Sequence, residues 1–216
     1  MSATELPTSP RARRRQQTID EIVAAAWRLA ARDGLASISM RELGREVGLR
    51  AQSLYGYFAA KDDLYDAMFR QGHEQLRAVL DLAPLPVGQP LDEAIEEVRR
   101  RLRTFVDFCN ADPTRYQLLF QRVVPGWEPS AASYALAVEQ LESLRIVLHQ
   151  LGVEREESVD LWTALITGLT SQQLSNDPGG DRWARLVDEA TDMFLAHALP
   201  DPPAATTTPP PGGTPT

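Results

Sequence analysis

The stretch ISMRELGREVGLRAQSLYGYFAAKDDL, residues 38–64, determines how the N-terminal part of this chain folds. Ser39 and Glu42 have the spacing of a capping box, which predicts a helix that begins directly after Ser39. Gly48 tolerates the left-handed conformation that ends a helix. A second short helix is expected over residues 51–57, and a third begins at the only lysine of the chain. The pattern predicts a helix-turn-helix.

The second helix of this pattern presents polar and aromatic side chains. Leu54 and Phe58 are four residues apart and face inward, whereas the other side chains of the segment project outward. A helix with one basic residue, Arg50, among small, polar and aromatic side chains fits the major groove of DNA. The residues alone therefore favour a DNA-reading segment.

This segment resembles the N-terminal domain of the TetR family of bacterial transcriptional regulators. In that family a capped helix and a Gly-hydrophobic turn precede a small or polar residue, an aliphatic residue, Tyr, any residue, His or Tyr, Phe and, three further on, Lys. The same order appears here as Ser39, Gly48-Leu49, Ser53-Leu54-Tyr55-Gly56-Tyr57-Phe58 and Lys61. The resemblance covers roughly residues 16–66 and is far more specific than a lone helix-turn-helix pattern.

The resemblance implies which residues contact double-stranded DNA. They are Ser39, Arg41, Arg50, Ala51, Gln52, Ser53, Tyr55, Gly56, Tyr57 and Lys61. Because the first residues of a recognition helix generally meet base edges, Arg50 is expected to contact guanine and Gln52 adenine. The two tyrosines, the lysine, Ser39 and Arg41 are expected to hold phosphates, which positions the protein without reading sequence.

Two of these assignments have plainer alternatives. Arg50 can serve as a phosphate contact, and the ring of Tyr55 can pack on the protein while its hydroxyl points to water. Arg50 and Gln52 stand where small residues are frequent in the family, and Gly56 stands where a bulky residue is common. These departures leave the expected fold intact and leave the operator sequence open.

A supporting helix is expected upstream, where Thr18 and Glu21 form a second capping-box pair. Residues 1–15 carry the basic run Arg11–Arg15 and are expected to be a disordered arm. Such an arm can reach DNA phosphates or the minor groove, or it can simply remain solvated.

Charge is divided unevenly along the chain, whose net charge is -8. Residues 11–63 hold ten basic against seven acidic residues, whereas the residues from 64 onward hold twelve against twenty-two. Binding to a polyanion is therefore expected only at the N-terminal part, and the acidic remainder should repel DNA.

Little in the sequence favours an enzyme. His73, His149 and His197 are scattered, and Cys109 is the only cysteine. We find no metal-spaced cluster, phosphate-binding loop or nucleophile elbow, so no catalytic residue, metal or cofactor is expected. With no membrane-length apolar run, no signal peptide and a single cysteine, the expected location is the cytoplasm, without a membrane partner.

Beyond the lysine the signals are helical almost throughout. The sequence therefore predicts an all-α fold, in which a three-helix N-terminal helix-turn-helix head stands on a C-terminal helical bundle domain that dimerises. Helices are expected at roughly 61–82, 90–110, 112–124, 130–151, 156–176 and 181–198. The predicted divisions are the arm at 1–15, the head at 16–60, a ligand-binding and dimerising body at 61–199, and a disordered Pro/Thr-rich tail at 200–216.

The last two helices each carry two apolar rows, which need two partners. Trp162, Ile166 and Leu169 form one row of the first helix, and Trp183, Val187 and Phe194 one row of the second. The other rows are assigned to a homodimer interface by resemblance: Leu161, Leu165, Gly168, Leu186, Ala190, Met193 and His197. Which row faces the second copy is left open, as is a compact monomer that buries both.

By resemblance, the middle helices should hold a pocket for a small-molecule effector. Aromatic and polar candidates for its lining are Phe105, Phe108, Cys109, Tyr116, Phe120, Trp127, Tyr134 and Trp162. Aromatic residues at helical spacing are, however, more often plain core, and both interpretations stand.

These observations together predict a ligand-responsive, homodimeric DNA-binding regulator. By resemblance it is a repressor that binds a palindromic operator and is released by the effector. The alternative is a helical interaction protein whose DNA-binding-like head no longer reads sequence. Tyr55, Tyr57 and Lys61 argue against that alternative because these side chains would hold DNA.

Overall fold

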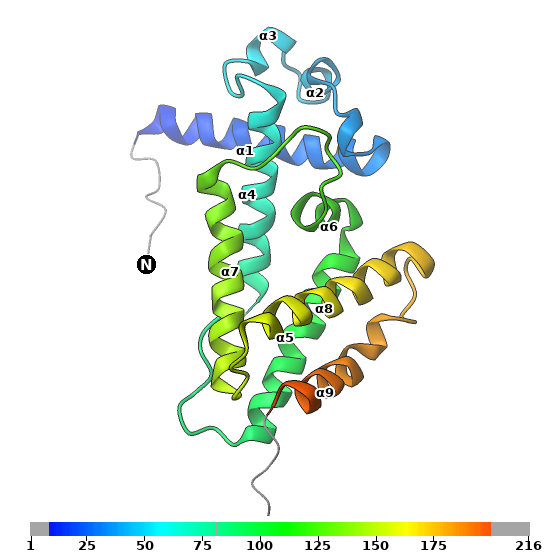
Figure 1. Ribbon diagram of the computed structural model, residues 1–216. Coiled ribbons are helices and arrows are strands. Elements are labelled where there is room, and N and C mark those ends of the chain that lie inside the picture. Colours follow the sequence, from blue (N-terminus) through cyan, green and yellow to red (C-terminus); the bar gives the residue numbers. More distant parts are fainter. Residues whose placement is uncertain (1–8, 81, 200–216) are drawn as a thin grey trace, which may run out of the picture.

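The computed structural model describes residues 9–80 and 82–199, and within these ranges all regular structure is helical (Figure 1). The N-terminal helices are α1 (Pro10–Asp33), the 3-10 turn η1 (Leu35–Ser37), α2 (Met40–Glu46) and α3 (Ala51–Leu54). The longer helices that follow are α4 (Lys61–Val79), α5 (Leu91–Ala111), α6 (Pro113–Phe120), α7 (Ala131–Gln150) and α8 (Glu156–Asn176). The 3-10 turn η2 (Ala184–Leu186) and α9 (Val187–Ala198) complete the fold. The predicted all-α fold is confirmed.

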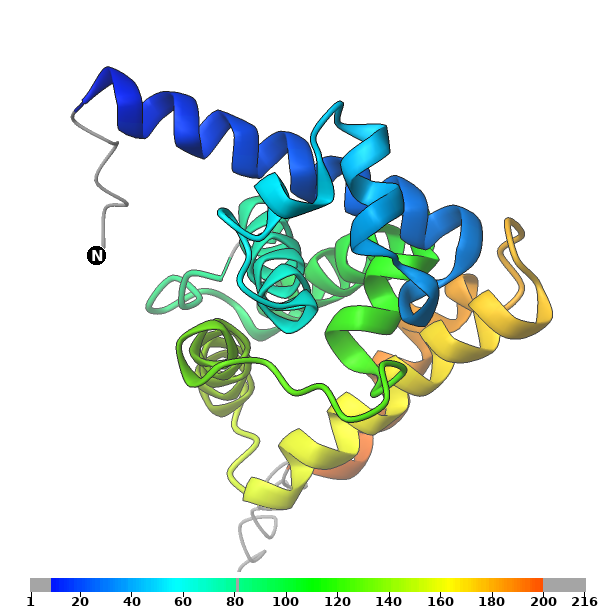
Figure 2. The ribbon, with the colours of Figure 1, turned by 90° about the horizontal axis from the view of Figure 1, so that it is seen from above.

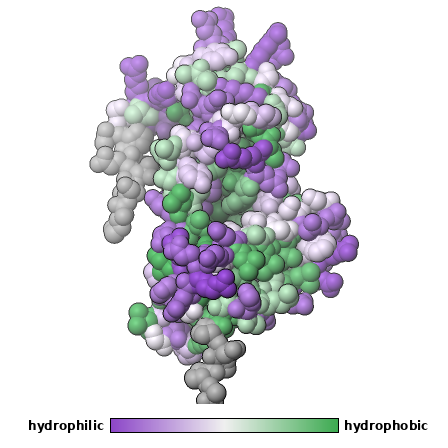
Figure 3. Space-filling model, viewed as in Figure 1, coloured by the Kyte–Doolittle hydropathy of each residue, from purple (hydrophilic) through white to green (hydrophobic). Residues whose placement is uncertain are grey.

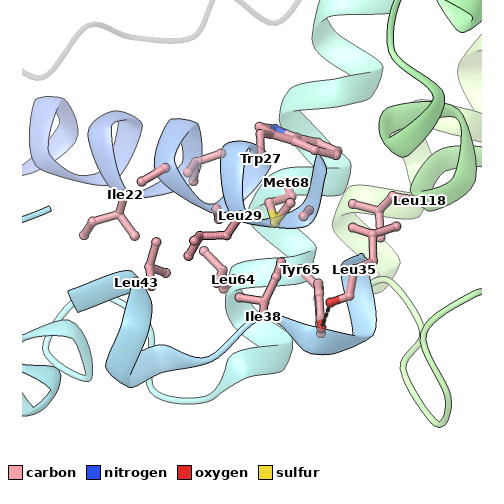
Figure 4. Packing of buried hydrophobic residues seen from close by; sticks show 14 of the residues in the cluster. Ile22, Trp27, Leu29, Leu35, Ile38, Leu43, Leu64, Tyr65, Met68 and Leu118 are labelled. Atoms are coloured by element: carbon pink, nitrogen blue, oxygen red, sulfur yellow. Dashed lines mark hydrogen bonds between the residues drawn. The ribbon is translucent and has the colours of Figure 1, made fainter. Parts of the chain in front are cut away.

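The head is built around apolar side chains of α1, α2, α3 and the first half of α4. Figure 4 shows labelled residues of α1, α2 and α4 filling the space between these helices. Leu43 and Leu64 are fully buried there. The hydroxyl of Tyr65 donates to the carbonyl of Leu35 at 2.6 Å, so η1 is fixed to α4. Burial of this size is the main stabilising contribution to the head.

The body has a second apolar cluster, formed by α5, α7, α8 and α9. Trp162 of α8 is 1% exposed, and its ring lies 4.4 Å from that of Phe194 in α9. α4 links the two clusters, since it begins in the head and continues alongside α7 (Figure 1). None of the helices in the described ranges is long and apolar enough to cross a membrane.

The start of α1 differs from the prediction. Residues 11–15 were expected in a disordered arm, but α1 begins at Pro10 and includes them. Ser9 caps the helix by accepting from the backbone N–H of Ala12 at 3.2 Å, and proline at the first helical position needs no N–H partner. Thr18 therefore lies inside the helix, where its hydroxyl donates to the carbonyl of Arg14.

The capping box expected at Ser39 is not formed, although α2 begins at the predicted residue. The Ser39 side chain makes no capping hydrogen bond, and Glu42 pairs instead with Arg32 of α1. An ion pair between two helices has thus replaced a contact within one turn.

Other differences concern helix ends. α3 stops at Leu54, and residues 55–57 form a tight turn in which Gly56 and Tyr57 donate to carbonyls three residues back. Glycine is a poor helix former, which favours this ending. α4 and α6 end before the predicted residues 82 and 124. The last helix starts at 187 because Gln173 accepts from the backbone of Trp183 and Ala184, which holds that stretch in a turn.

The predicted division at residues 60 and 61 stays a prediction. The head cluster includes Leu64 and Met68 of α4 and Leu118 of α6, so its packing extends beyond residue 60. Residues 1–8 of the predicted arm and the predicted tail at 200–216 lie outside the described residues.

Candidate nucleic-acid interface and effector cavity

The turn between α2 and α3 brings these helices close together at one end of the molecule (Figure 1). Gly48 has φ +68°, a conformation that favours glycine. A Cβ at Gly44 would lie 2.8 Å from the carbonyl oxygen of Leu49, so α2 needs glycine where the turn passes it. Both glycines fix how α3 is presented to solvent.

The surface of α2 and the recognition segment, residues 50–57, is polar and exposed. Figure 3 shows hydrophilic residues projecting at this end of the molecule. Tyr55 is 53% exposed, although it is a large aromatic residue. Arg41, Arg45 and Arg50 are exposed, and within the described part of the chain none of them forms an ion pair. Their charges are available to an anionic partner.

The remaining predicted DNA contacts fall into two groups. Ser39, Gln52, Ser53 and Gly56 are exposed, as the prediction requires. Ala51, Tyr57 and Lys61 are half-buried. Lys61 donates from Nζ to the carbonyl of Ala36 at 2.9 Å, and its ammonium lies 5.2 Å from the ring centre of Tyr65. The lysine is thus held by the head and not freely extended.

Arg15 is a residue that sequence reasoning missed. Its Nη2 donates to the carbonyl of Gly56 at 3.1 Å, and its guanidinium lies 5.1 Å from the ring centre of Tyr57. The first turns of α1, which carry the exposed side chains of Arg11, Arg13 and Arg14, extend beyond the rest of the head in Figure 2. A basic run next to a helix was visible in the sequence, but its contact with the recognition segment was not.

The body contains a cavity of about 400 Å³ between α4, α5, α6, α7 and α8. Four of the eight predicted lining residues do line it: Phe105, Phe120, Tyr134 and Trp162. His73 also lines the cavity, as do Arg101 and Gln140, which were not predicted for it. His73 is 1% exposed, and burial lowers its pKa below the ordinary histidine value.

The other four predicted lining residues lie elsewhere. Trp127 packs its ring 5.7 Å from that of Tyr65 in the head cluster. Phe108 lies below the guanidinium of Arg115, at 5.4 Å. Tyr116 and Cys109 are buried core residues. Burial raises the pKa of the Cys109 thiol far above its usual range, which leaves the thiol protonated and unreactive.

Four of the seven predicted dimer residues are exposed on α8 and α9, whereas Leu165 and Leu186 are half-buried. Leu161 is 51% and Met193 65% exposed, and Gly168 and His197 are also exposed. Ala190 is buried inside its own chain and cannot belong to an exposed face. Ala190 lies on the inner side of α9 together with Phe194, one turn later, which packs on Trp162.

Comparisons with known proteins agree with this geometry. Residues 22–68 match the model of a family described as bacterial regulatory proteins, tetR family. A curated relative, the HTH-type transcriptional repressor Rv1353c of Mycobacterium tuberculosis, is 25% identical over 208 residues, which cover 89% of this chain and 76% of the relative.

Two solved structures have a similar fold. One is BioQ with its natural double-stranded DNA operator, with a TM-score of 0.56 and 21% identity over 83% of this chain and 98% of BioQ. The other is the TetR family protein ActR of Streptomyces coelicolor in complex with actinorhodin, with a TM-score of 0.55 and 18% identity over 83% of this chain and 95% of ActR. Residues 22–68, with their helix-turn-helix geometry, therefore match the tetR family of bacterial regulatory proteins, and the described chain shares its fold with TetR family regulators.

Proposed function

We propose that this regulator is a cytoplasmic repressor, which binds a palindromic operator as a homodimer and is released by a small-molecule effector. The observation that carries the proposal is the surface of α2 and the recognition segment, where Arg41, Arg45 and Arg50 are exposed and, within the described residues, form no ion pairs. Such cations beside an exposed Tyr55 match what a duplex offers, namely phosphates and base edges. BioQ, with its similar fold, was solved on its operator.

The residues of this surface form two groups, those that contact base edges and those that contact phosphates. Arg50 and Gln52 lie at the start of α3, from which side chains reach base edges. Ser39, Arg41, Tyr55, Tyr57 and Lys61 hold phosphates around them, with Ala51, Ser53 and Gly56 close to the groove. Lys61 also anchors η1, because its Nζ donates to the carbonyl of Ala36.

Dimerisation is supported by the α8–α9 face, defined by Leu161, Leu165, Gly168 and Met193. Figure 3 shows hydrophobic residues gathered over the part of the molecule where α8 and α9 lie. Exposed apolar side chains on two adjacent helices favour association with a second copy, which removes them from water. Two-fold symmetry then presents two recognition segments to successive major grooves, about 34 Å apart, on a palindromic site.

Release by an effector is supported by the cavity and by the course of α4. His73 and Leu76 of α4 line the cavity, and the same helix begins at Lys61, next to the recognition segment. A ligand weakens DNA binding only if it binds better to the conformation that does not fit the operator. ActR, whose fold is similar, was solved with actinorhodin.

The experiment that tests this function is fluorescence anisotropy on the DNA upstream of the protein's own gene and on scrambled DNA, at two salt concentrations. We expect selective binding to the upstream DNA, which Tyr55→Ala weakens strongly. Equally weak, salt-sensitive binding to both DNAs would contradict sequence reading at this site.

The homodimer is tested by sedimentation of Leu161→Asp, which places a charge on the α8–α9 face. We expect a dimer for the unmodified protein and a monomer for the variant. Ile146→Asp is the matched control, because Ile146 of α7 is also an exposed apolar residue, at 43%, but lies outside this face. If the two variants have the same oligomeric state in sedimentation, the α8–α9 face is not the dimer interface.

A further inference from the structure

The cavity is lined almost entirely by apolar side chains from α4, α5, α6, α7 and α8. Its polar lining residues are His73, Arg101, Tyr134, Gln140, Ser143, Thr163 and Thr167, and among the described residues no acidic side chain lines it. Arg101 donates from its Nε to Glu97 at 2.8 Å, and this carboxylate also accepts from Arg100. A volume of about 400 Å³ lies in the range of small-molecule sites. The lining therefore favours an uncharged, largely apolar molecule.

The protonation of His73 follows from its contacts with Gln140. The amide Nε2 of Gln140 donates to the backbone carbonyl of His73 at 2.8 Å, and a carbonyl can only accept. The amide oxygen of Gln140 must therefore face His73, and it lies 2.8 Å from Nδ1. Because this oxygen also only accepts, Nδ1 carries a proton and donates it. Burial keeps the ring neutral by lowering its pKa, so Nε2 bears a lone pair.

This lone pair has no partner within the described residues. His73 Nε2 is buried, and no side chain or backbone group donates to it. The ring lies between Phe69 and Phe120, with ring-centre distances of 4.5 and 6.0 Å, and neither phenyl ring can donate a conventional hydrogen bond. A buried acceptor without a donor is costly and rare in folded proteins. A residue that lines the cavity thus has a buried acceptor atom without a hydrogen-bond donor.

We propose that the effector of this cavity is an uncharged, largely apolar molecule with a hydroxyl or N–H group, which donates a hydrogen bond to Nε2 of His73. The proposal rests on the proposed effector function of this cavity and adds the chemical class of the ligand. Since Nε2 is closed over, the apolar side chains beside it, Phe120 among them, shift when the donor enters. Phe120 is the last residue of α6, so binding repacks the end of that helix.

Nε2 of His73 should also determine which ligands the cavity prefers. A ligand that brings a donor satisfies Nε2, whereas an equally apolar ligand without one leaves the acceptor unpaired. An anionic ligand gains little, because the guanidinium of Arg101 already has a carboxylate partner. The affinity should therefore depend on the donor more than on the size of the apolar part.

Three probes of one shape test this by isothermal titration calorimetry on the full chain: 4-hexylphenol, its methyl ether 4-hexylanisole, and 4-hexylbenzoate. We expect the phenol to bind roughly tenfold more tightly than the ether, and the benzoate to bind more weakly than the phenol. In His73→Phe the preference for phenol over ether should vanish. Tyr134→Phe is the matched control: it removes a lining hydroxyl but leaves the imidazole of His73 in place, and the preference should persist.

Several results would overturn the proposal. Equal affinities for phenol and ether, tightest binding of the benzoate, or no binding of any probe would each refute the ligand class. These comparisons use the unmodified protein and stand even if His73→Phe does not fold. If a folded His73→Phe variant still prefers the phenol over the ether, another residue must accept the ligand's hydrogen bond. If the protein binds its operator but does not prefer the phenol over the ether, only this inference is wrong. If the protein does not bind an operator, the proposed function itself is wrong.

Discussion

Arginine has different surroundings at the two ends of this molecule. In α2 and the recognition segment, Arg41, Arg45 and Arg50 are exposed and, within the described residues, form no ion pairs. In α5 the arginines are instead paired with carboxylates of their own helix or of α9. Arg99 pairs with Glu96 and Asp192, for example.

This difference teaches how one residue type performs two tasks. Arginines without partners leave a positive field in solution and can exchange counterions for phosphates. Those of α5 are paired locally, and the planar groups of Arg99 and Arg103 connect α5 to α9. Composition alone hides the distinction, because the chain is acidic overall while its positive field is confined to the head.

The largest expected effect comes from removing the three exposed arginines of the head together. In Arg41→Ala/Arg45→Ala/Arg50→Ala, operator binding should weaken by at least ~3 kcal/mol, since the groups that meet bases and those that meet phosphates are removed at once. The dependence of the binding constant on salt should become shallower by about 0.9 for each phosphate that the variant no longer neutralises. Anisotropy titrations at several salt concentrations measure both quantities. If a folded triple variant binds the operator as tightly as the unmodified protein, the exposed arginines of the head do not bind DNA, and the proposed difference from the arginines of α5 is wrong.

Arg50→Ala alone sharpens the comparison within the head. We expect operator binding to weaken by ~1–3 kcal/mol, with a relaxed preference at one base pair in each half-site. Competition binding with operators changed at single base pairs measures this preference. An equal loss of affinity on every sequence would make Arg50 a phosphate contact.

The paired arginines should act on stability and on its pH dependence. The hydrogen bond from Arg100 to Glu97, with a second from Arg101, lowers the pKa of Glu97 from 4.5 to about 2. A lowered pKa means that the carboxylate stabilises the fold above pH 4.5, and that this contribution is lost as pH falls through about 2. Glu97→Gln should therefore be less stable than the unmodified protein by ~1 kcal/mol at neutral pH.

Urea unfolding from neutral to acidic pH checks this expectation, with DNA binding as the control readout. The difference in unfolding free energy between Glu97→Gln and the unmodified protein should shrink as the pH is lowered below 4.5. A difference that is constant with pH would assign the effect to packing and not to charge.

Arg103→Gln should have the smallest effect. Its guanidinium pairs with Asp188 of α9 at 2.7 Å, but both side chains are more than 40% exposed, so water and salt screen the attraction. The expected loss of stability is ~0.2–1 kcal/mol, and it should diminish further in high salt. Operator affinity should not change. A weakening of DNA binding as large as that of Arg50→Ala would show that charge acts at long range regardless of pairing.

Local patterns in the sequence predicted most of the fold. The start of α2, the turn at Gly48 and the start of α4 depend on neighbouring residues, and all three stand where they were expected. The α8–α9 face was also visible as a second apolar row. Leu161 and Met193 of that row are indeed exposed, whereas Ala190 of the same row is buried and Leu165 packs partly against the body cluster.

The failures of prediction arise from contacts that are distant in sequence. Periodicity identifies an aromatic residue as inward-facing but does not say which of two clusters it joins, so Trp127 was expected at the cavity and lies against Tyr65. The pair of His73 and Gln140 joins residues 67 positions apart. Neither residue stands in a motif, and only the packing of α7 against α4 brings them together.

Because Arg15 contacts Gly56, proteolysis in the first turns of α1 can report whether DNA is bound to the recognition segment. Trypsin cleaves after arginine, and Arg11, Arg13 and Arg14 lie in the first turns of α1 beside that contact. A protease needs an unfolded segment, so cleavage there measures how often these turns open. Binding of DNA to the segment that α1 contacts should slow the cut. A limited digest of unlabelled protein therefore reports whether the recognition segment is occupied.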